Sequence, residues 1–429
     1  MRRWTVLAAA LVLLVWSWQG RGDALPAADS AEQLASFSKA LHGAVEAKQI
    51  GGGSALVARQ GRVVYFEAAG LADASPDRPM ARDAIFRIAS MTKPITSVAA
   101  MILVEDGKLS VDDPVSKYIP EFAKQMVLAD PRTGQTRPAS REVRVRDLLT
   151  QTSGITYKFM NKPGIGEMYI KAGVYDGLDV ASESLQSNCR KIASLPLLCD
   201  PGAAWEYGLN TDVLGRVVEA ASGQSLDEFF ARRVLGPLKM NDTFFTVPAD
   251  KVSRLAAVYS FDQKTKQLVE AGPDNRLVQD FTKPPAIESG GGGLVSTTAD
   301  YSRFCQMVVN RGELDGVQIL SPASIELMGT NQISQAALAA NTGGLSNLFS
   351  EAVGFGLDFL VFNDPRKAGS MVGKGTLSWG GAAGTWFWID PTNDLIFIGM
   401  IQRFGSAGGV DLAALSRTLV YQALVDPRR

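Results

Sequence analysis

The sequence of 429 residues contains a single histidine, His42, and this scarcity excludes several common kinds of active site. A Ser-His-Asp triad needs a histidine as its base, and the chain contains no Gly-x-Ser-x-Gly nucleophile elbow. A zinc site built from three histidines is impossible, and the His-Glu-x-x-His motif is absent. His42 stands beside Leu41 in a predicted N-terminal helix, where we expect it to be a surface or capping residue.

Cysteine is also scarce, and neither sign of charge is in excess, with 43 Lys and Arg against 44 Asp and Glu. The formal net charge is −1 and no long basic run occurs, so the charge pattern does not indicate a nucleic-acid partner. The glycine-rich phosphate-binding motifs of nucleotide enzymes are absent. The three cysteines, Cys189, Cys199 and Cys305, form neither a disulfide framework nor a zinc spacing. Cys189 and Cys199 could close one short loop in an oxidising compartment, and three unpaired core thiols are the alternative.

The apolar run at the N-terminus is short for a membrane span. A basic start, residues 1–3, precedes apolar residues 4–18. This order is typical of a signal peptide, whereas a transmembrane helix needs about 20 apolar residues. We therefore predict that residues 1–28 are a signal peptide and that the protein is exported, either to the periplasm or out of the cell. An uncleaved N-terminal anchor is the alternative, and we expect membrane contact only through it.

Apolar periodicity divides the rest of the chain into strand-rich ends and a helical middle. The N-terminal part predicts a helix, a hairpin and an apolar helix at 31–48, 54–67 and 92–106. Strand patterns return at 354–362, 377–379, 385–390 and 394–401. We predict an α+β fold in which an antiparallel sheet flanked by helices is built from residues 29–106 and 286–429. A mainly helical domain, residues 107–285, is inserted between these two parts.

Without a histidine base, a hydrolase must use Lys, Tyr, Asp or Glu, which directs attention to the Ser-x-x-Lys pattern. Residues three apart share a helix face, so the lysine amine can reach the serine hydroxyl. Burial or cationic neighbours can lower the pKa of the amine, so that it loses its proton and can act as a base. One copy, Ser36 to Lys39, lies in a polar and exposed helical pattern. The other copy, Ser90 to Lys93, begins the apolar helix, where backbone N–H groups favour a developing oxyanion. A plain N-cap is the alternative role for Ser90.

Five segments in order resemble the serine β-lactamase and penicillin-binding-protein superfamily. The likeness spans about residues 35 to 425, extends to the class C β-lactamases and is nearest to the family VIII carboxylesterases. The segments are FRIASMTK at 86–93, LLTQTSG at 148–154, WEYGLNTDVLG at 205–215, GGGGL at 290–294 and SWGGAAGT at 378–385. The resemblance implies a β-lactamase/transpeptidase-like fold, and it implies no metal and no organic cofactor.

The resemblance also implies roles for individual residues. Ser90 becomes the acylated nucleophile, and Lys93 and Tyr207 become its base pair. A free tyrosine has a pKa of about 10, so Tyr207 needs a cationic neighbour to act near neutral pH. A buried aromatic residue with a bonded hydroxyl is the alternative for Tyr207. The N–H groups of Ser90 and Ala382 would form the oxyanion hole. The oxyanion and substrate-binding residues implied are Ala382, Gly381, Gly380, Trp379 and Asn210.

Two departures from the β-lactamase motifs bear on the substrate. Leu209 stands where the second motif has its asparagine, with Asn210 one place on, and Trp379 stands where the third motif has its lysine. The missing lysine and amide would help to bind a β-lactam, so the departures favour neutral esters. We therefore predict a carboxylesterase acting on short-to-medium acyl esters through an acyl-enzyme. The alternatives are a β-lactamase or D-Ala-D-Ala carboxypeptidase, an acyltransferase or amide hydrolase, and a non-catalytic scaffold protein.

Overall fold

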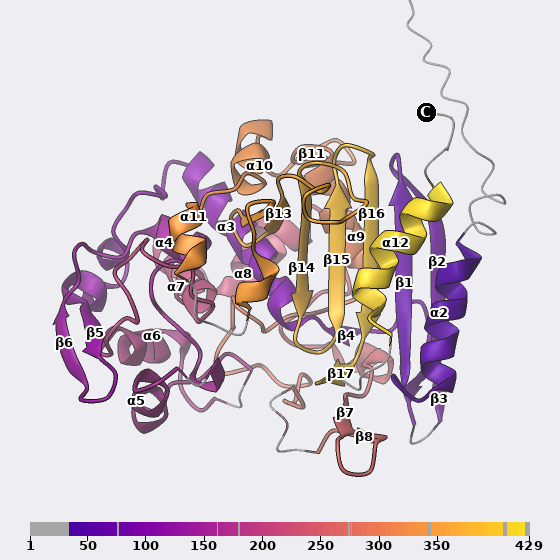
Figure 1. Cartoon of the computed structure of the whole chain (residues 1–429), viewed down its shortest axis with the longest axis horizontal. Coiled ribbons are helices and arrows are strands. Elements are labelled where there is room, and N and C mark those ends of the chain that lie inside the picture. The colour runs from indigo at the N-terminus through magenta and orange to yellow at the C-terminus, as the bar shows by residue number, and fades with distance from the viewer. Residues whose placement is uncertain are drawn as a thin grey trace, which may run out of the picture.

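The fold is built around one sheet to which both ends of the chain contribute (Figure 1). A computed structural model describes residues 34–424, except 75–76, 161, 179–180, 273–274, 276, 341–344 and 406–409, so the predicted signal peptide lies outside the described residues. The eight strands are antiparallel in the order β12-β13-β14-β15-β16-β1-β2-β3. Their bounds are β1 (Gly52–Arg59), β2 (Arg62–Asp73), β3 (Arg78–Pro79), β12 (Val353–Phe355), β13 (Leu360–Phe362), β14 (Thr376–Gly381), β15 (Thr385–Asp390) and β16 (Leu395–Ile401).

Helices cover both faces of this sheet because its central strands are apolar on both sides. Side chains alternate between the faces along β15, so Trp388 and Phe387 point in opposite directions. Helices α2 (Ala35–Glu46) and α12 (Leu412–Leu424) lie on the Trp388 face, where the Trp388 ring stacks on Tyr421 of α12. Helix α9 (Thr298–Val309) lies on the other face, where Tyr301 packs against Phe387.

A mainly helical region lies beside the sheet, at the far side from α2 in Figure 1. Its elements are α4 (Val145–Leu149), α5 (Ile165–Lys171), α6 (Leu185–Ala193), α7 (Asn210–Ser222) and α8 (Leu226–Phe230), with one small hairpin, β5–β6 (Met126–Asp130 and Gln135–Pro138). The hairpin β7–β8 (Tyr259–Asp262 and Gln267–Glu270) lies below the sheet in Figure 1, where β7 pairs with the short strand at 403–404. Further elements in the return to the sheet are β9 (Val295–Ser296), β10 (Glu313–Leu314), β11 (Val317–Gln318), α10 (Pro322–Met328), α11 (Gln335–Ala339) and β17 (Arg403–Phe404). None of the helices in the described ranges has the length and apolar character that a membrane span requires. The division into domains stays a prediction.

Helix α3 (Thr92–Glu105) runs through the middle of the molecule and packs against α7. Every residue from Thr92 to Leu103 is buried, which explains why this helix is apolar on all sides rather than on one stripe. Its polar side chains therefore need partners inside the protein. Ser97, for example, donates a hydrogen bond of 2.7 Å to the buried carboxylate of Asp358. The predicted nucleophile lies at the start of this enclosed helix.

The predicted strand at 354–362 is wrong in its extent, because two short strands, β12 and β13, occupy this stretch. They form a hairpin, and the turn between them contains Asp358 with a φ of 60°. A left-handed residue cannot continue a strand, so the chain reverses there. The three cysteines are free thiols in the structure, and Cys189 and Cys305 are fully buried, so Cys189 and Cys199 do not form a disulfide.

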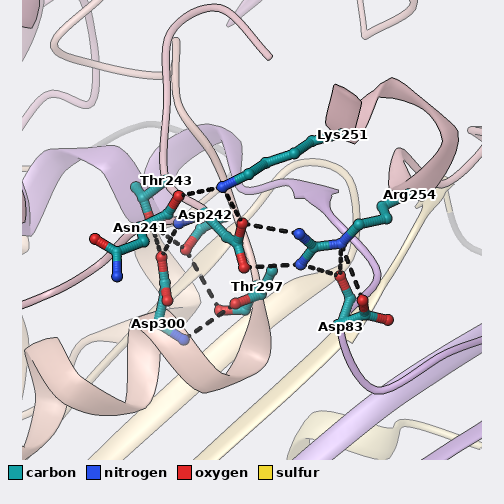
Figure 2. Close-up of polar contacts among 9 residues, drawn as sticks. Asp83, Asn241, Asp242, Thr243, Lys251, Arg254, Thr297 and Asp300 are labelled. Carbon is teal, nitrogen blue, oxygen red and sulfur yellow. Dashed lines mark hydrogen bonds and ion pairs between the residues drawn. The ribbon is translucent and has the colours of Figure 1, made fainter. Parts of the chain in front are cut away.

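A network of charged groups fixes the segment that leads to α3 (Figure 2). The Arg254 guanidinium binds both carboxylate oxygens of Asp242, at 2.8 and 2.9 Å, and also donates to the backbone oxygen of Asp83. Lys251 donates to the same Asp242 carboxylate at 2.8 Å. The N–H of Asp242 in turn donates to Asp300 in the first turn of α9. The network thereby ties the approach to the predicted nucleophile to a helix that supports the sheet.

Candidate active site

Ser90 lies in a tight turn between a short strand and α3. Strand β4 (Phe86–Arg87) pairs with β9, and a 3₁₀ turn (Ala89–Met91) follows it directly. Ala89 has a φ of 42°, a conformation that residues with a Cβ adopt at a cost of about 1–3 kcal/mol. The turn leaves Ser90 only partly buried while Ala89 and Met91 are buried on either side. The chain therefore presents the Ser90 hydroxyl at a strained strand-to-helix junction.

Lys93 lies on the first turn of α3 and is completely buried. Its amine donates hydrogen bonds to the backbone oxygen of Gly291 at 2.6 Å, to the Tyr157 hydroxyl at 3.0 Å and to Ser90 Oγ at 3.3 Å. It also lies 4.8 Å from the centre of the Tyr207 ring. The hydrogen-bond acceptors are neutral, and none of them is a carboxylate.

Tyr207 approaches the same serine from the segment before α7. Its hydroxyl lies 2.7 Å from Ser90 Oγ, and the side chain is buried apart from 8% of its surface. The ring is held by stacking on Trp205, with 5.7 Å between ring centroids. Structure and sequence agree on this set: Ser90, Lys93 and Tyr207 lie together, although 117 positions separate the tyrosine from the serine. A hydroxyl that contacts both an amine and a phenol can lose its proton to that pair.

Sequence reasoning missed Tyr157, which is also part of the site. It is buried and accepts the hydrogen bond from Lys93, and its ring stacks on Phe159 at 4.7 Å. Burial, with added contributions from Tyr207 and Asp212, raises the pKa of Tyr157 well above its usual value, so its hydroxyl stays protonated. The only signal for it was a tyrosine three places after the LLTQTSG segment, and no spacing rule connects that place to a distant lysine.

The glycines at 380 and 381 bring the end of β14 against the turn that carries Ser90. A Cβ on Gly381 would lie 2.3 Å from the backbone oxygen of Ile88, so only glycine allows the strand to approach this closely. Thr385 donates to the same Ile88 oxygen. Ala382 follows as an exposed residue of the turn between β14 and β15. Its role as an oxyanion donor stays a prediction.

Trp379 and Asn210 have different surroundings. Trp379 lies on β14 with its ring 5.5 Å from Tyr207 and 5.3 Å from Phe355, so it forms part of an aromatic wall beside the phenol. The structure does not bring Asn210 to Ser90. Asn210 begins α7 and is fully buried, and its amide donates to Gln151 Oε1 at 2.8 Å. The helical turn directs this side chain toward the loop of Gln151, and a role for Asn210 in substrate binding stays a prediction.

A serine whose hydroxyl contacts a buried lysine and a tyrosine, in place of a histidine, defines the class of this site: the protein is a serine hydrolase. The chain belongs to the Beta-lactamase family, whose model matches residues 37–422. The fold class and the family resemblance predicted from the sequence are therefore confirmed.

Relatives and solved structures agree with this assignment. The chain is similar to protein Rv1367c of Mycobacterium tuberculosis, with 38% identity over 364 residues that cover 83% of this chain and 87% of that protein. It is 34% identical to esterase EstB of Burkholderia gladioli over 372 residues, which cover 84% of this chain and 88% of EstB. The solved structure of EstCE1, described as a hydrolase with promiscuous acyltransferase activity, matches with a TM-score of 0.77 and 28% identity, covering 92% of this chain and 100% of that one.

Proposed function

We propose that this protein is a carboxylesterase that hydrolyses short-to-medium acyl esters through an acyl-enzyme on Ser90. The observation that carries the proposal is the convergence of the Tyr207 hydroxyl, at 2.7 Å, and the Lys93 amine, at 3.3 Å, on Ser90 Oγ. No histidine is needed, because the two groups together can accept the proton of the serine. The similarity to esterase EstB supports the choice of an ester substrate.

The reaction proceeds in two steps. Ser90 Oγ attacks the ester carbonyl while its proton passes to the Lys93–Tyr207 pair, and the oxyanion is held by the N–H groups of Ser90 and Ala382. The pair then returns the proton to the leaving alcohol, and Ser90 is acylated. In the second step the pair removes a proton from water, which attacks the acyl-enzyme and releases the carboxylic acid. Ser90 recovers its proton, so that the enzyme is regenerated.

The site favours neutral esters over β-lactams because its walls are aromatic. Trp379 stands where the third β-lactamase motif has its lysine, with its ring 5.5 Å from that of Tyr207, and the Asn210 amide donates to Gln151. Trp205 is buried and packs edge-on against Phe349 and Phe355, so it supports the Tyr207 ring on which it stacks. An apolar acyl chain that packs against aromatic rings at the site gains about 25 cal/mol for each Å² removed from water.

A second candidate function is acyl transfer to an alcohol other than water. The acyl-enzyme on Ser90 is the same, and only the acceptor in the second step differs. The similarity to EstCE1, a hydrolase with promiscuous acyltransferase activity, favours this candidate over amide hydrolysis. Adding a primary alcohol to the assay and measuring the new ester against the free acid separates the two activities.

We also propose that the protein is exported to the periplasm or secreted. The basic start and the apolar residues 4–18 support this proposal. Expression of the full chain in a bacterial host, followed by N-terminal sequencing of the exported protein, tests it. A mature N-terminus between about residues 25 and 30 is expected. Full-length protein that stays in the cytoplasm would contradict the proposal.

The test of the catalytic assignment compares the wild type with Ser90→Ala on p-nitrophenyl butyrate and on nitrocefin. We expect rapid ester cleavage with little nitrocefin turnover, and a loss of about 10³-fold or more in kcat for the variant. Ser36→Ala is the matched control, because Ser36 is the exposed first residue of the other Ser-x-x-Lys copy. Ester cleavage that survives in Ser90→Ala would overturn the assignment, and faster cleavage of nitrocefin would favour a β-lactamase.

A further inference from the structure

Asp212, on the first turn of α7, is a buried acid close to the catalytic lysine, yet it belongs to none of the predicted roles. It is 1% exposed. One of its oxygens, Oδ1, accepts a hydrogen bond of 2.5 Å from the Ser289 hydroxyl. The other oxygen, Oδ2, has no hydrogen-bond partner of good geometry in the described part of the chain. An incompletely satisfied buried carboxylate destabilises the folded protein, so its position beside the catalytic lysine needs a physical explanation.

The second carboxylate oxygen of Asp212, Oδ2, lies against the Gly291 peptide, whose carbonyl binds Lys93. A Cβ added to Gly291 would stand only 2.3 Å from Asp212 Oδ2, which shows how closely this glycine packs on the carboxylate. The carbonyl oxygen of the same Gly291 accepts the shortest hydrogen bond that Lys93 makes, at 2.6 Å. The Gly291 peptide therefore lies between the Asp212 carboxylate and the Lys93 amine and contacts both of them.

We propose that Asp212 is a positioning residue: its carboxylate fixes the Gly291 peptide that holds the Lys93 amine, and its charge balances the ammonium form of Lys93 inside the site. This proposal rests on the proposed function, in which Lys93 and Tyr207 share the proton that they take from Ser90. Lys93 has no carboxylate among its hydrogen-bond partners, so the counter-charge for a buried ammonium comes from nearby acids that do not contact the amine.

The charged and titratable groups around Lys93 come from four elements. Tyr157 and Tyr207 are in direct contact with it, from the loop after α4 and from the segment before α7. The acids are Asp212 on α7 and Asp358 in the turn between β12 and β13. Asp358 accepts hydrogen bonds from Ser97, Gln151 and Thr211, and these neutral donors stabilise its ionised form without cancelling its charge.

Asp212 differs from Asp358 in that one of its oxygens packs on the Gly291 peptide, whose carbonyl binds Lys93. Burial raises its pKa, and the charge of Lys93, together with the Ser289 hydroxyl and the N–H groups of Gly291 and of Asp212 itself, opposes this increase. Its charge also acts on Tyr157 and on the buried thiol of Cys189 on α6, and it raises the pKa of both groups. In this site an ionised Asp212 and a protonated Lys93 favour one another.

The test is the pH dependence of kcat/KM for p-nitrophenyl butyrate in Asp212→Asn. The acid limb reports the second proton of the Lys93–Tyr207 pair. Removing the negative charge makes that proton easier to lose, so the limb should move to lower pH by about one unit. Ser289→Ala keeps the carboxylate but removes the hydroxyl that favours its ionised form, and a smaller shift in the same direction is expected.

A second readout separates this proposal from the proposed function. The rate at which a fluorophosphonate labels Ser90 is measured against pH in the wild type and both variants, and it needs no ester substrate. A labelling profile that shifts as described supports the role of Asp212 even if the natural substrate is not an ester. Variants that fold and react more slowly at every pH, with the acid limb unmoved, would overturn the proposal and leave Asp212 a purely structural residue.

Discussion

The phenol groups of Tyr207 and Tyr157 both lie beside the Lys93 amine, and their contacts indicate different roles. The Tyr207 hydroxyl lies 2.7 Å from Ser90 Oγ, whereas the Tyr157 hydroxyl lies 3.0 Å from the Lys93 amine. Only Tyr207 can exchange a proton directly with the serine. Tyr157 orients the lysine, and its raised pKa, caused first by burial, keeps it a neutral partner.

Replacing each phenol by phenylalanine should therefore have unequal effects. Tyr207→Phe removes a proton-transfer group and should lower kcat on p-nitrophenyl butyrate by about 10²- to 10⁴-fold. Tyr157→Phe removes one hydrogen bond to a charged or polar amine, which corresponds to a loss of about 10- to 100-fold. Both rings are kept, so circular dichroism should show native folds. Equal losses in the two variants would contradict this division of roles.

Sequence reasoning found some residues of the site and missed others for a physical reason. Ser90 and Lys93 are three residues apart, so helical geometry alone brings them together. Tyr207 was reached only through a motif. Tyr157 carries no motif and meets Lys93 through packing of a distant loop. Asn210 stands one place beyond the asparagine position of the second motif, and at the start of α7 its amide donates to Gln151.

At the scale of elements, the strands were predicted well wherever burial is uniform. The predicted strand at 385–390 coincides with β15, because both of its faces are covered and all six of its residues are buried. The stretch 354–362 was equally apolar, yet it contains a turn at Asp358, whose φ is 60°. That turn is favoured by tertiary contacts, since the Asp358 N–H donates to the Leu149 carbonyl and the Asp358 carboxylate accepts from the distant residues Ser97 and Gln151. A local pattern cannot reveal such a contact.

The start of α9 should make stability depend on pH. Burial raises the pKa of Asp300 from 3.8 to about 6, although the Asp242 N–H and the Thr243 hydroxyl oppose this (Figure 2). A carboxyl group with a raised pKa in the folded state favours folding while it is protonated, and this contribution is lost as pH rises through the folded-state value.

Asp300→Asn tests that sign, because it removes the titration and keeps a side-chain acceptor. The free energy of unfolding of the wild type minus that of the variant should fall by about 2 kcal/mol between pH 4 and pH 7. Denaturant unfolding at a series of pH values measures this difference. Asp83→Asn, an exposed member of the same network, is the control and should show little dependence. A difference that rises with pH would mean that the network lowers the pKa of Asp300 instead.

At the scale of the whole molecule, the sheet region and the helical region share one interior. Helix α3 precedes residue 107, yet it packs against α7 of the helical region and is buried over Thr92–Leu103. Asp358, from the sheet region, binds Ser97 of α3 together with Gln151 and Thr211 of the helical region. Neither region can keep these buried polar groups satisfied without the other.

We therefore expect one cooperative unfolding transition, despite the prediction of two domains from the sequence. Differential scanning calorimetry should give a calorimetric enthalpy equal to the van't Hoff enthalpy. Residues 107–285 expressed alone should not fold, because they lack α3 and would expose the surface of α7 that packs on it. Asp358→Ala should lower the midpoint in the full chain without splitting the transition, as the buried donors lose their common acceptor. Two separate transitions, or a folded fragment, would show instead that the helical region is an independent domain and that the site lies between two units free to move.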